Sequence, residues 1–323
     1  MAKIIGRRVK LGVAMESSRG VGVAPAMAIP FAGLTLMPKV DSILVENALG
    51  QIADTEDRLI EEKYAEGEIE APLRDQTFAY ILASLIGASP SSSGSSGEFV
   101  HDFTLANTNQ HKSLTLTVID GIQSEMLKLA MINSLEITAE LGGLVKYTAG
   151  FISKVGVNTT ATATPSVENL FTKKGVQVKI AANLAGLDAA SVLELKSLTL
   201  TINKNAERDS VLGSEEPIDV LNKQFSVEGS LNLTLESQAY RNYMLDNSKK
   251  AMRIDIINPD VSLNTNNPRL RIELPRVSFD GFEPDRSLED IMKQTINFKA
   301  HYDLTNSQDI ITTCSLRNGK TSY

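Results

Sequence analysis

Cysteine, tryptophan and long apolar runs are almost absent from this sequence. It has one cysteine, Cys314, no tryptophan, and aromatic residues at 5% of its 323 positions. One cysteine excludes an intrachain disulfide framework and a cysteine-rich metal site, and few aromatics argue against a surface that stacks on sugars or bases. No window approaches the ~18 apolar residues of a membrane span, and the N-terminal stretch lacks the apolar run of a signal peptide. We therefore expect a soluble protein made in the cytoplasm.

The charge balance is acidic, with a formal net charge of −7. A general phosphate-binding surface is not expected from such a balance. The basic pairs at 7–8, 173–174 and 249–250 are dispersed among acidic residues. We interpret them as solvated groups or contacts between subunits.

Residues that could carry chemistry do not form a recognisable constellation. The histidines His101, His111 and His301 are scattered, and no third metal ligand or catalytic base accompanies them. Gly20-Val-Gly22 lacks the third glycine and the following helix of a dinucleotide-binding loop, so a turn is expected there. No Gly-x-Ser-x-Gly or HExxH motif is present. The sequence predicts that the protein is not an enzyme and has no metal or cofactor.

What the sequence does contain is a strong strand pattern. In SLEITAELGGLVKYTAGFISK, residues 134–154, apolar residues recur at every second position on both sides of Gly142-Gly143. Glu, Thr and Lys occupy the positions between them. This alternation is typical of strands with one buried face, and the glycine pair favours a tight turn, so a hairpin is predicted.

Two helices and two loops are also predicted. The apolar residues of 74–86 follow a helical stripe that ends at Gly87, and the segment 237–247 has a similar spacing. The acidic segment 41–63 has no clean periodicity and is expected to be a long loop. The serine- and glycine-rich stretch ASPSSSGSSGE is expected to be a flexible loop.

Segments of the first half recur in the same order in the second half. The paired segments are EGEIEAPLRDQTFAYILA from Glu66 and EGSLNLTLESQAYRNYML from Glu228, LTL from Leu34 and LTL from Leu198, and LVKYTAGF from Leu144 and IMKQTINF from Ile291. Their offsets of 162, 164 and 147 residues differ only by loop length, which favours duplication of one unit. With the boundary in the low-complexity run VNTTATATP, the predicted units are 1–157 and 158–323.

The order of these elements resembles that of the tail tube proteins of long-tailed bacteriophages. The likeness includes the strand beginning with EG, the helix that follows it, the hairpin at 134–154 and the closing run LRIELPRVSFDGFEPDRSLEDIMKQTINFKAHYD, with NGKTSY near the end of the chain. The resemblance implies a mainly β fold of two tandem tail-tube-like units, each a β-sandwich or partial barrel with one flanking helix.

The resemblance also implies a structural function in the virion tail. Subunits would form stacked rings, and genomic DNA would pass through the channel without sequence-specific binding. If each half supplies one ring segment, three chains form a pseudo-sixfold ring; a ring of six whole chains remains the alternative. The expected partners are further copies of the chain, a tape measure protein, a tail terminator and distal tail proteins, with no membrane.

Two groups of residues are candidates for these roles. The candidates for the channel lining form two alternative sets, because the sequence does not say which hairpin faces inward. One set is Glu66, Glu68, Glu70, Glu228 and Glu236, and the other is Glu136 and Glu140 with Lys293. The candidates for contacts between rings lie in 41–63 and 204–223 and are Asp54, Glu56, Asp57, Glu215 and Glu216. Both predicted helices are expected to lie outside the barrel and pack on its wall.

Other protein classes remain possible from the sequence. The inner-tube proteins of contractile injection or secretion systems are related, but they are typically single-unit chains that form hexamers, so the duplication counts against them. A two-domain β-sandwich adhesion module would need a secretion signal and exposed aromatic residues. A hydrolase on a β scaffold would need a converging nucleophile and base.

Overall fold

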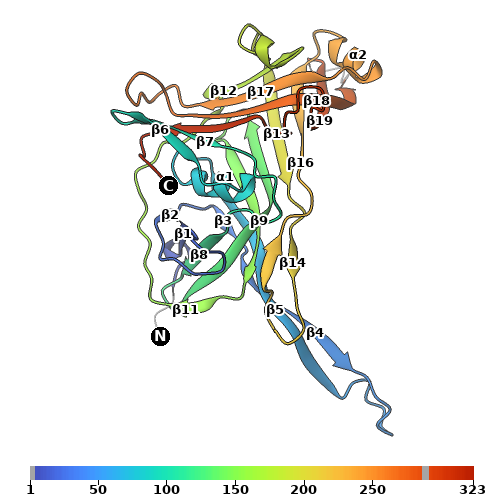
Figure 1. The fold of residues 1–323 in the computed structure, drawn as a ribbon. Coiled ribbons are helices and arrows are strands. Elements are labelled where there is room, and N and C mark those ends of the chain that lie inside the picture. Colours follow the sequence, from blue (N-terminus) through green and yellow to red (C-terminus); the bar gives the residue numbers. More distant parts are fainter. Residues whose placement is uncertain (1–3, 286–290) are drawn as a thin grey trace.

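The fold is mainly β, as predicted, in a computed structural model that describes residues 4–285 and 291–323. Part of the closing run, 286–290, lies outside the described residues. Figure 1 shows two short helices among many strands, with one hairpin projecting below the rest.

The helices are α1 (Phe78–Ile86) and α2 (Ala239–Leu245). The strands are β1 (Lys10–Met15), β2 (Met27–Ile29), β3 (Gly33–Leu34), β4 (Met37–Val45), β5 (Asp57–Pro72), β6 (Ser91–Ser95), β7 (Glu98–Phe103), β8 (Leu114–Ile119), β9 (Ser124–Glu140), β10 (Lys146–Lys154), β11 (Val157–Thr159), β12 (Val176–Ala181), β13 (Leu195–Asn203), β14 (Glu207–Asp209), β15 (Asp219–Leu221), β16 (Ser226–Thr234), β17 (Lys250–Ile257), β18 (Arg269–Asp285), β19 (Lys293–Ala300) and β20 (Thr313–Asn318).

A continuous antiparallel sheet runs through both halves of the chain. Its ladders join β3 and β4 to β5, then β5 to β10, β10 to β9, β9 to β13, β13 to β16, β16 to β19 and β19 to β18. We call this the long sheet. The predicted hairpin at 134–154 is confirmed as the C-terminal half of β9 with β10, and Gly142 in its turn has φ +91°.

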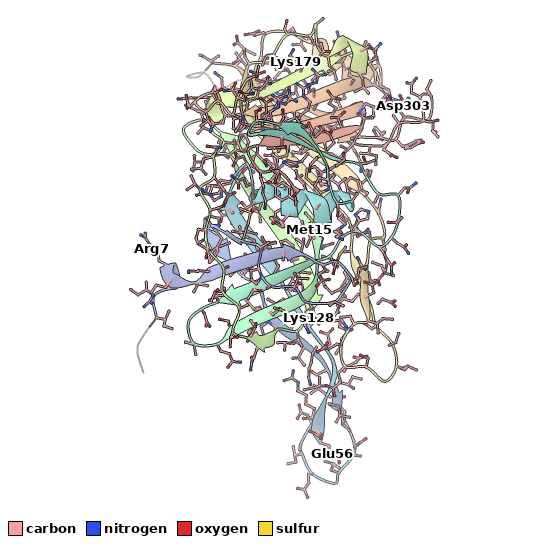
Figure 2. All side chains as sticks on the ribbon, turned by 60° about the vertical axis from the view of Figure 1, so that its left-hand side comes forward. Arg7, Met15, Glu56, Lys128, Lys179 and Asp303 are labelled. Atoms are coloured by element: carbon pink, nitrogen blue, oxygen red, sulfur yellow. The ribbon has the colours of Figure 1, made fainter. Side chains whose placement is uncertain are left out.

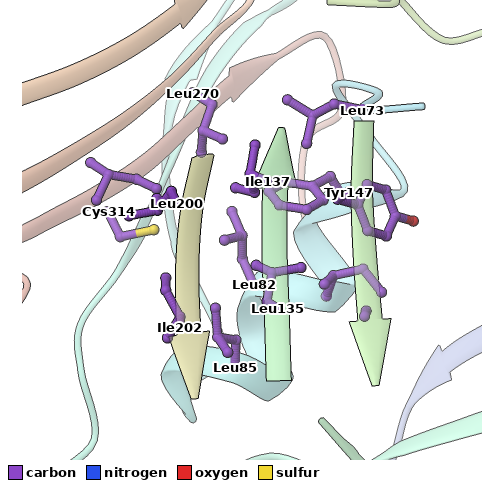
Figure 3. Packing of buried hydrophobic residues seen from close by; sticks show 14 of the residues in the cluster. Leu73, Leu82, Leu85, Leu135, Ile137, Tyr147, Leu200, Ile202, Leu270 and Cys314 are labelled. Atoms are coloured by element: carbon purple, nitrogen blue, oxygen red, sulfur yellow. The ribbon is translucent and has the colours of Figure 1, made fainter. Parts of the chain in front are cut away.

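One face of the long sheet is dry because the period-2 pattern of each strand is in phase with that of its neighbour. Leu135 and Ile137 of β9 lie opposite Ile202 and Leu200 of β13, and all four are buried. Tyr147 of β10 is opposite Ile137 and is also buried. Figure 3 shows these side chains pointing toward α1 from three adjacent strands. This apolar face forms the core of the protein.

The helix α1 packs on the dry face of the long sheet, and it is buried on all sides rather than along the single stripe that its spacing predicts. Every residue of α1 is buried, and the helix contacts β9, β1 and β7. The reason is in its sequence, FAYILASLI, which is apolar on all sides rather than along one stripe. Strand β1 pairs with β2 and β8 to complete the cover.

The C-terminal end of α1 is tied to the second half of the chain. Gly87 takes the left-handed conformation, with φ +95°, that ends many helices. Nζ of the fully buried Lys204 donates a 2.7 Å hydrogen bond to the Ser84 carbonyl, and Nδ1 of His111 lies 3.1 Å from the Leu85 carbonyl oxygen. Burial lowers the pKa of Lys204 well below its ordinary value.

The second helix, α2, differs from α1 because none of its residues is buried. It packs on β18 through an aromatic cluster in which Tyr240 and Tyr243 each lie 6.0 Å from Phe279, measured between ring centroids. Burial of its ring raises the pKa of Tyr240 to about 12. This helix therefore covers part of β18 and remains in contact with solvent.

Two segments that the sequence predicts to be loops are in part strands. Most of 41–63 belongs to β4 and β5, which form a hairpin arm with only 46–56 as its loop. The arm is exposed on both faces, so its sequence has no alternation to reveal a strand. The serine-rich β6 pairs with β7 over Ser91 to Ser95, where backbone hydrogen bonds rather than side chains define the strand.

The two halves of the chain are joined by more than the β9–β13 ladder. The last strand, β20, pairs with β7 of the first half, and Tyr323 packs edge-on against Tyr80 and His101. Glu168, beyond the predicted boundary at 157, accepts hydrogen bonds from the backbone N–H and hydroxyl of Thr77 at the start of α1. The halves therefore share one core.

Candidate functional site

The face of the long sheet opposite the core carries most of the predicted glutamates. Registers from strand to strand give a row across the sheet, which runs Glu70, Thr148, Glu136, Thr201, Glu228 and Lys299. Residues directly opposite in antiparallel strands lie on the same face. Acidic side chains alternate with hydroxyls in this row, and adjacent glutamates are two strands, or about 10 Å, apart. We call this surface the acidic face.

The acidic face therefore unites two sets of residues that the sequence left as alternatives. Glu66, Glu68 and Glu70 lie at every second position of β5, and Thr148 of β10 stands opposite both Glu70 and Glu136. Glu140 lies on the same face of β9, opposite Ser197. Glu236 is the exception, because it follows the end of β16 at Thr234 and belongs to no ladder.

Sequence reasoning missed Glu283, an exposed residue of β18 on the same face. It stands opposite Thr295 of β19 as Glu136 stands opposite Thr148 of β10. The offset of 147 residues between the two hairpins contained the signal, since 136 plus 147 is 283. Hydroxyl and amide side chains fill most of the positions between the acids; examples are Thr138, Thr199, Asn232 and Thr295.

Two lysines partly neutralise the charge of the acidic face through solvent-exposed ion pairs. Lys146 Nζ lies 3.3 Å from Glu70 Oε1, and Lys299 Nζ lies 4.0 Å from Glu228 Oε2. All four side chains are about half exposed, so each pair is worth only ~0–1 kcal/mol. The face thus keeps an excess of negative charge in contact with water.

The hairpin arm carries three of the candidate residues for contacts between rings. Asp54, Glu56 and Asp57 are exposed at the end of the arm farthest from the core, as the label of Glu56 in Figure 2 shows. Glu56 accepts a 2.7 Å hydrogen bond from the Asn47 side chain. The arm also exposes large apolar side chains, namely Met37, Val40, Ile43, Leu44, Leu49, Ile52, Leu59 and Ile60. These residues make it an apolar projection with an acidic tip.

The segment 204–223 braces the base of the arm. Lys63 of β5 pairs with Glu215, and its backbone N–H donates to the Glu215 carbonyl at 2.6 Å. Arg208 lies over the ring of Tyr64 and forms ion pairs with Asp41 at 3.0 Å and Glu62 at 2.8 Å. The two predicted inter-ring segments therefore lie side by side. Because Glu215 contacts Lys63 and Glu216 follows it in the same loop, both residues lie near the base of the arm rather than at its tip.

The histidines and the cysteine take part in local structure. His101 lies 2.7 Å from the Ser92 hydroxyl and 3.0 Å from Asn318 Oδ1, and His301 lies 2.8 Å from the Ser278 hydroxyl. Burial raises the pKa of the Cys314 thiol to about 12. Over residues 4–285 and 291–323, no three His, Cys, Asp or Glu side chains form a group that could hold a metal ion. In the same part of the chain, no helix is long and apolar enough to cross a membrane.

The described residues thus form a long sheet with a dry face and an acidic face. The family model of the phage tail tube protein matches residues 6–300, and the chain belongs to this family. No curated protein matches the chain. The protein is therefore a structural component of a phage tail tube, and its place is in the tail of the virion.

Proposed function

We propose that copies of this chain close into rings whose wall is the long sheet, with the acidic face lining the channel. The observation that carries the proposal is the opposition of the two faces: Leu135 and Ile137 are buried on one side, and Glu136 and Thr138 face water on the other. A sheet whose outer edges pair with the next copy leaves no strand edge exposed. The chain would be made in the host cytoplasm before assembly.

We further propose that the two halves, 1–157 and 158–323, are duplicated ring segments. The ladder β5–β10–β9 has the same register as β16–β19–β18: Gly67 faces Phe151 as Gly229 faces Phe298. Each hairpin also has a bulge at the corresponding place, which leaves Asn133 and Asp280 without an opposite residue in the ladder. Three chains then supply six similar segments, whereas six whole chains would supply twelve.

The acidic face suits the passage of DNA without binding. Phosphates approach a surface of carboxylates and hydroxyls, so electrostatic repulsion disfavours the contacts that would hold DNA. We expect phage particles with Glu70→Lys, Glu136→Lys and Glu228→Lys combined to eject DNA more slowly, and more so at low salt. If the variant and the wild type differ in ejection rate by no more at low salt than at high salt, this role for the acidic face is contradicted. The tape measure protein would occupy the channel before DNA, and terminator and distal tail proteins would contact the end rings.

Stacking of rings is assigned to the hairpin arm and the loop that braces it. Apolar side chains on both strands of the arm, such as Ile43 and Leu59, are about half exposed in the isolated chain. Burial of such side chains against the next ring would contribute about 25 cal/mol per Å² of apolar surface. Shortening the loop at 46–56 removes the tip but keeps the ladder between β4 and β5.

Electron microscopy of the purified chain tests the proposal. Concentrated protein should form hollow rings and tubes, and rotational averages of end-on views should show three large or six alternating lobes. The variant with a shortened 46–56 loop should still form single rings but few tubes. A monomer at every concentration, with or without tail initiator proteins, would refute the ring. Six identical large lobes would instead support a ring of six whole chains.

A further inference from the structure

Within the described part of the long sheet, the two halves of the chain meet edge to edge at the β9–β13 ladder, and this junction can be compared with the outer edges of the sheet. In the junction, β9 pairs antiparallel with β13 from Ser134 opposite Asn203 to Glu140 opposite Ser197. Its dry face joins Leu135 to Ile202, and its acidic face joins Glu136 to Thr201. Apolar residues therefore meet apolar residues, and polar residues meet polar ones.

The strands at the two outer edges correspond to the two strands of this junction. On one edge, β18 pairs with β19 as β9 pairs with β10, with Asp280 and Asn133 at corresponding bulges. On the other edge, Leu34 faces Ile69 and Met37 faces Glu66, as Leu198 faces Leu231 and Thr201 faces Glu228. Among described strands, β3 and β4 pair only with β5. Residues 281–284 of β18 pair, among the strands that the structure describes, only with β19.

We infer that residues 281–284 of β18 in one copy pair antiparallel with residues 36–39 of the next copy, in the register of the β9–β13 junction. Adding 147 to a residue number in β9 gives the corresponding residue of β18, and subtracting 164 from a residue number in β13 gives the corresponding residue of β4. These offsets convert the pairs of the β9–β13 junction into the pairs expected between copies. Glu136 opposite Thr201 becomes Glu283 opposite Met37, and Leu135 opposite Ile202 becomes Phe282 opposite Pro38. This inference rests on the proposed ring and specifies how its copies join.

The residues brought together by this register are chemically compatible. On the dry side, the half-buried Phe282 meets Pro38, and Pro284 meets Leu36. On the acidic side, Lys39 lies opposite Gly281 and diagonal to Glu283, within reach of an ion pair. A slip by one residue would turn Glu283 toward the dry side against Pro38, because successive side chains point to opposite faces.

Pro38 gives the β4 edge a further property. Thr35 donates its backbone N–H to the Glu68 carbonyl at 3.0 Å, so in a regular strand the alternate positions 36 and 38 direct their backbone groups to the outer edge. Pro38 has no N–H to offer there. Proline at an edge discourages pairing with unrelated strands. The junction between copies therefore depends more on side chains than the internal junction does, which favours the matching edge of a second copy.

Disulfide cross-linking of assembled protein tests the register. Residues directly opposite in an antiparallel ladder have Cα atoms about 4.5–5.5 Å apart, within the range for a disulfide. The test variant is Met37→Cys with Glu283→Cys, and the slipped control is Pro38→Cys with Glu283→Cys. The internal control is Glu136→Cys with Thr201→Cys, whose residues face each other within one chain. Cys314 is buried with a raised pKa and can remain.

After mild oxidation, a non-reducing gel should show the test variant as covalent dimers and closed trimers that disappear on reduction. The internal control should stay at the size of one chain but lose its free thiols, which shows that this position oxidises. Rings that cross-link in the slipped variant but not in the test variant would overturn the register. If the unmodified protein forms no rings, the proposed function fails, and the inference fails with it.

Charge exchange gives a second test that needs no cysteine. Lys39→Glu should reduce the yield of rings, because it brings a second carboxylate beside Glu283 of the next copy. Adding Glu283→Lys to the same chain should restore the yield, whereas Glu136→Lys, in the middle of the long sheet between β10 and β13, should not. Equal yields of rings in the single and the double variant would contradict the predicted diagonal contact.

Discussion

Replacement of Gly229 by alanine should destabilise the protein although it adds a single methyl group. A Cβ atom at this position would lie 2.2 Å from the Thr199 carbonyl oxygen and 2.7 Å from Cζ of Phe298. Carbon and carbonyl oxygen normally approach to about 3.3–3.6 Å in sheets. The ladder between β13 and β16 must therefore open by about 1 Å, which is the shortfall from that normal approach.

The expected cost is a difference between two effects. Overpacking of a core typically lowers the free energy of unfolding by about 1–3 kcal/mol. Alanine also restricts the unfolded chain, which raises the free energy of unfolding by about 0.4–1 kcal/mol. Neither Thr199 nor Phe298 can move freely, because the first is in a central strand and the second is 2% exposed. We expect a net loss of about 1–2 kcal/mol in the free energy of unfolding from these two ranges.

Two matched glycine variants provide the comparison. Gly143→Ala has no atom within 4 Å of its new Cβ and needs no left-handed backbone, so it should be neutral or slightly stabilising. Gly67→Ala meets Leu36 and Thr35 at 2.5 Å, but these residues link the edge strands β3 and β4 and can shift outward, so a smaller loss is expected. The measurement is denaturant unfolding of the unassembled chain. A Gly229→Ala variant as stable as Gly143→Ala would refute the reasoning.

Three further predictions concern other parts of the core. Glu16→Gln should lose about 2–4 kcal/mol in denaturant unfolding, since the buried carboxylate accepts four hydrogen bonds and an amide cannot accept them all; an unchanged midpoint would contradict this. Leu135→Ala should lower the free energy of unfolding by about 2–5 kcal/mol, but Thr138→Ala on the acidic face by less than about 0.5 kcal/mol. Equal losses would contradict the assignment of the two faces. Burial would raise the pKa of Asp219, but hydrogen bonds from Arg19 and from a backbone N–H lower it below 3.8. Asp219 therefore contributes stability above about pH 4 that is lost on acidification below it, and the stability difference between wild type and Asp219→Asn should shrink as the pH falls through that range.

Local patterns in the sequence were sufficient for the elements that are buried on one face. Alternation across Gly142-Gly143 predicted the β9–β10 hairpin, and the spacing from Phe78 to Ile86 predicted α1. The same alternation put Glu66, Glu68 and Glu70 on one side of their strand. These features follow from the 2.0- and 3.6-residue periods of strand and helix, which are visible within a single segment.

The arm and the burial of α1 show where this kind of reading fails. The arm is exposed on both faces and lacks a periodic signal, so 41–63 looked like a loop. The helix α1 shows a stripe at helical spacing, yet its remaining positions are also apolar, which is the sign of a helix enclosed on all sides. The ladder between β7 and β20 joins segments some two hundred residues apart. The local sequence of neither strand indicates that the other is its pairing partner.

The sequence by itself determined which side chains share a face within each strand, because that depends only on the alternation of neighbouring residues. Only the tertiary structure decided that Glu70, Glu136 and Glu228 lie in one row, because their alignment depends on the registers of β5, β10, β9, β13 and β16. A register is a relation between distant segments, fixed by the joint burial of residues such as Ile137 and Leu200. The acidic face is therefore a property of the folded sheet, although every glutamate in it was visible in the sequence.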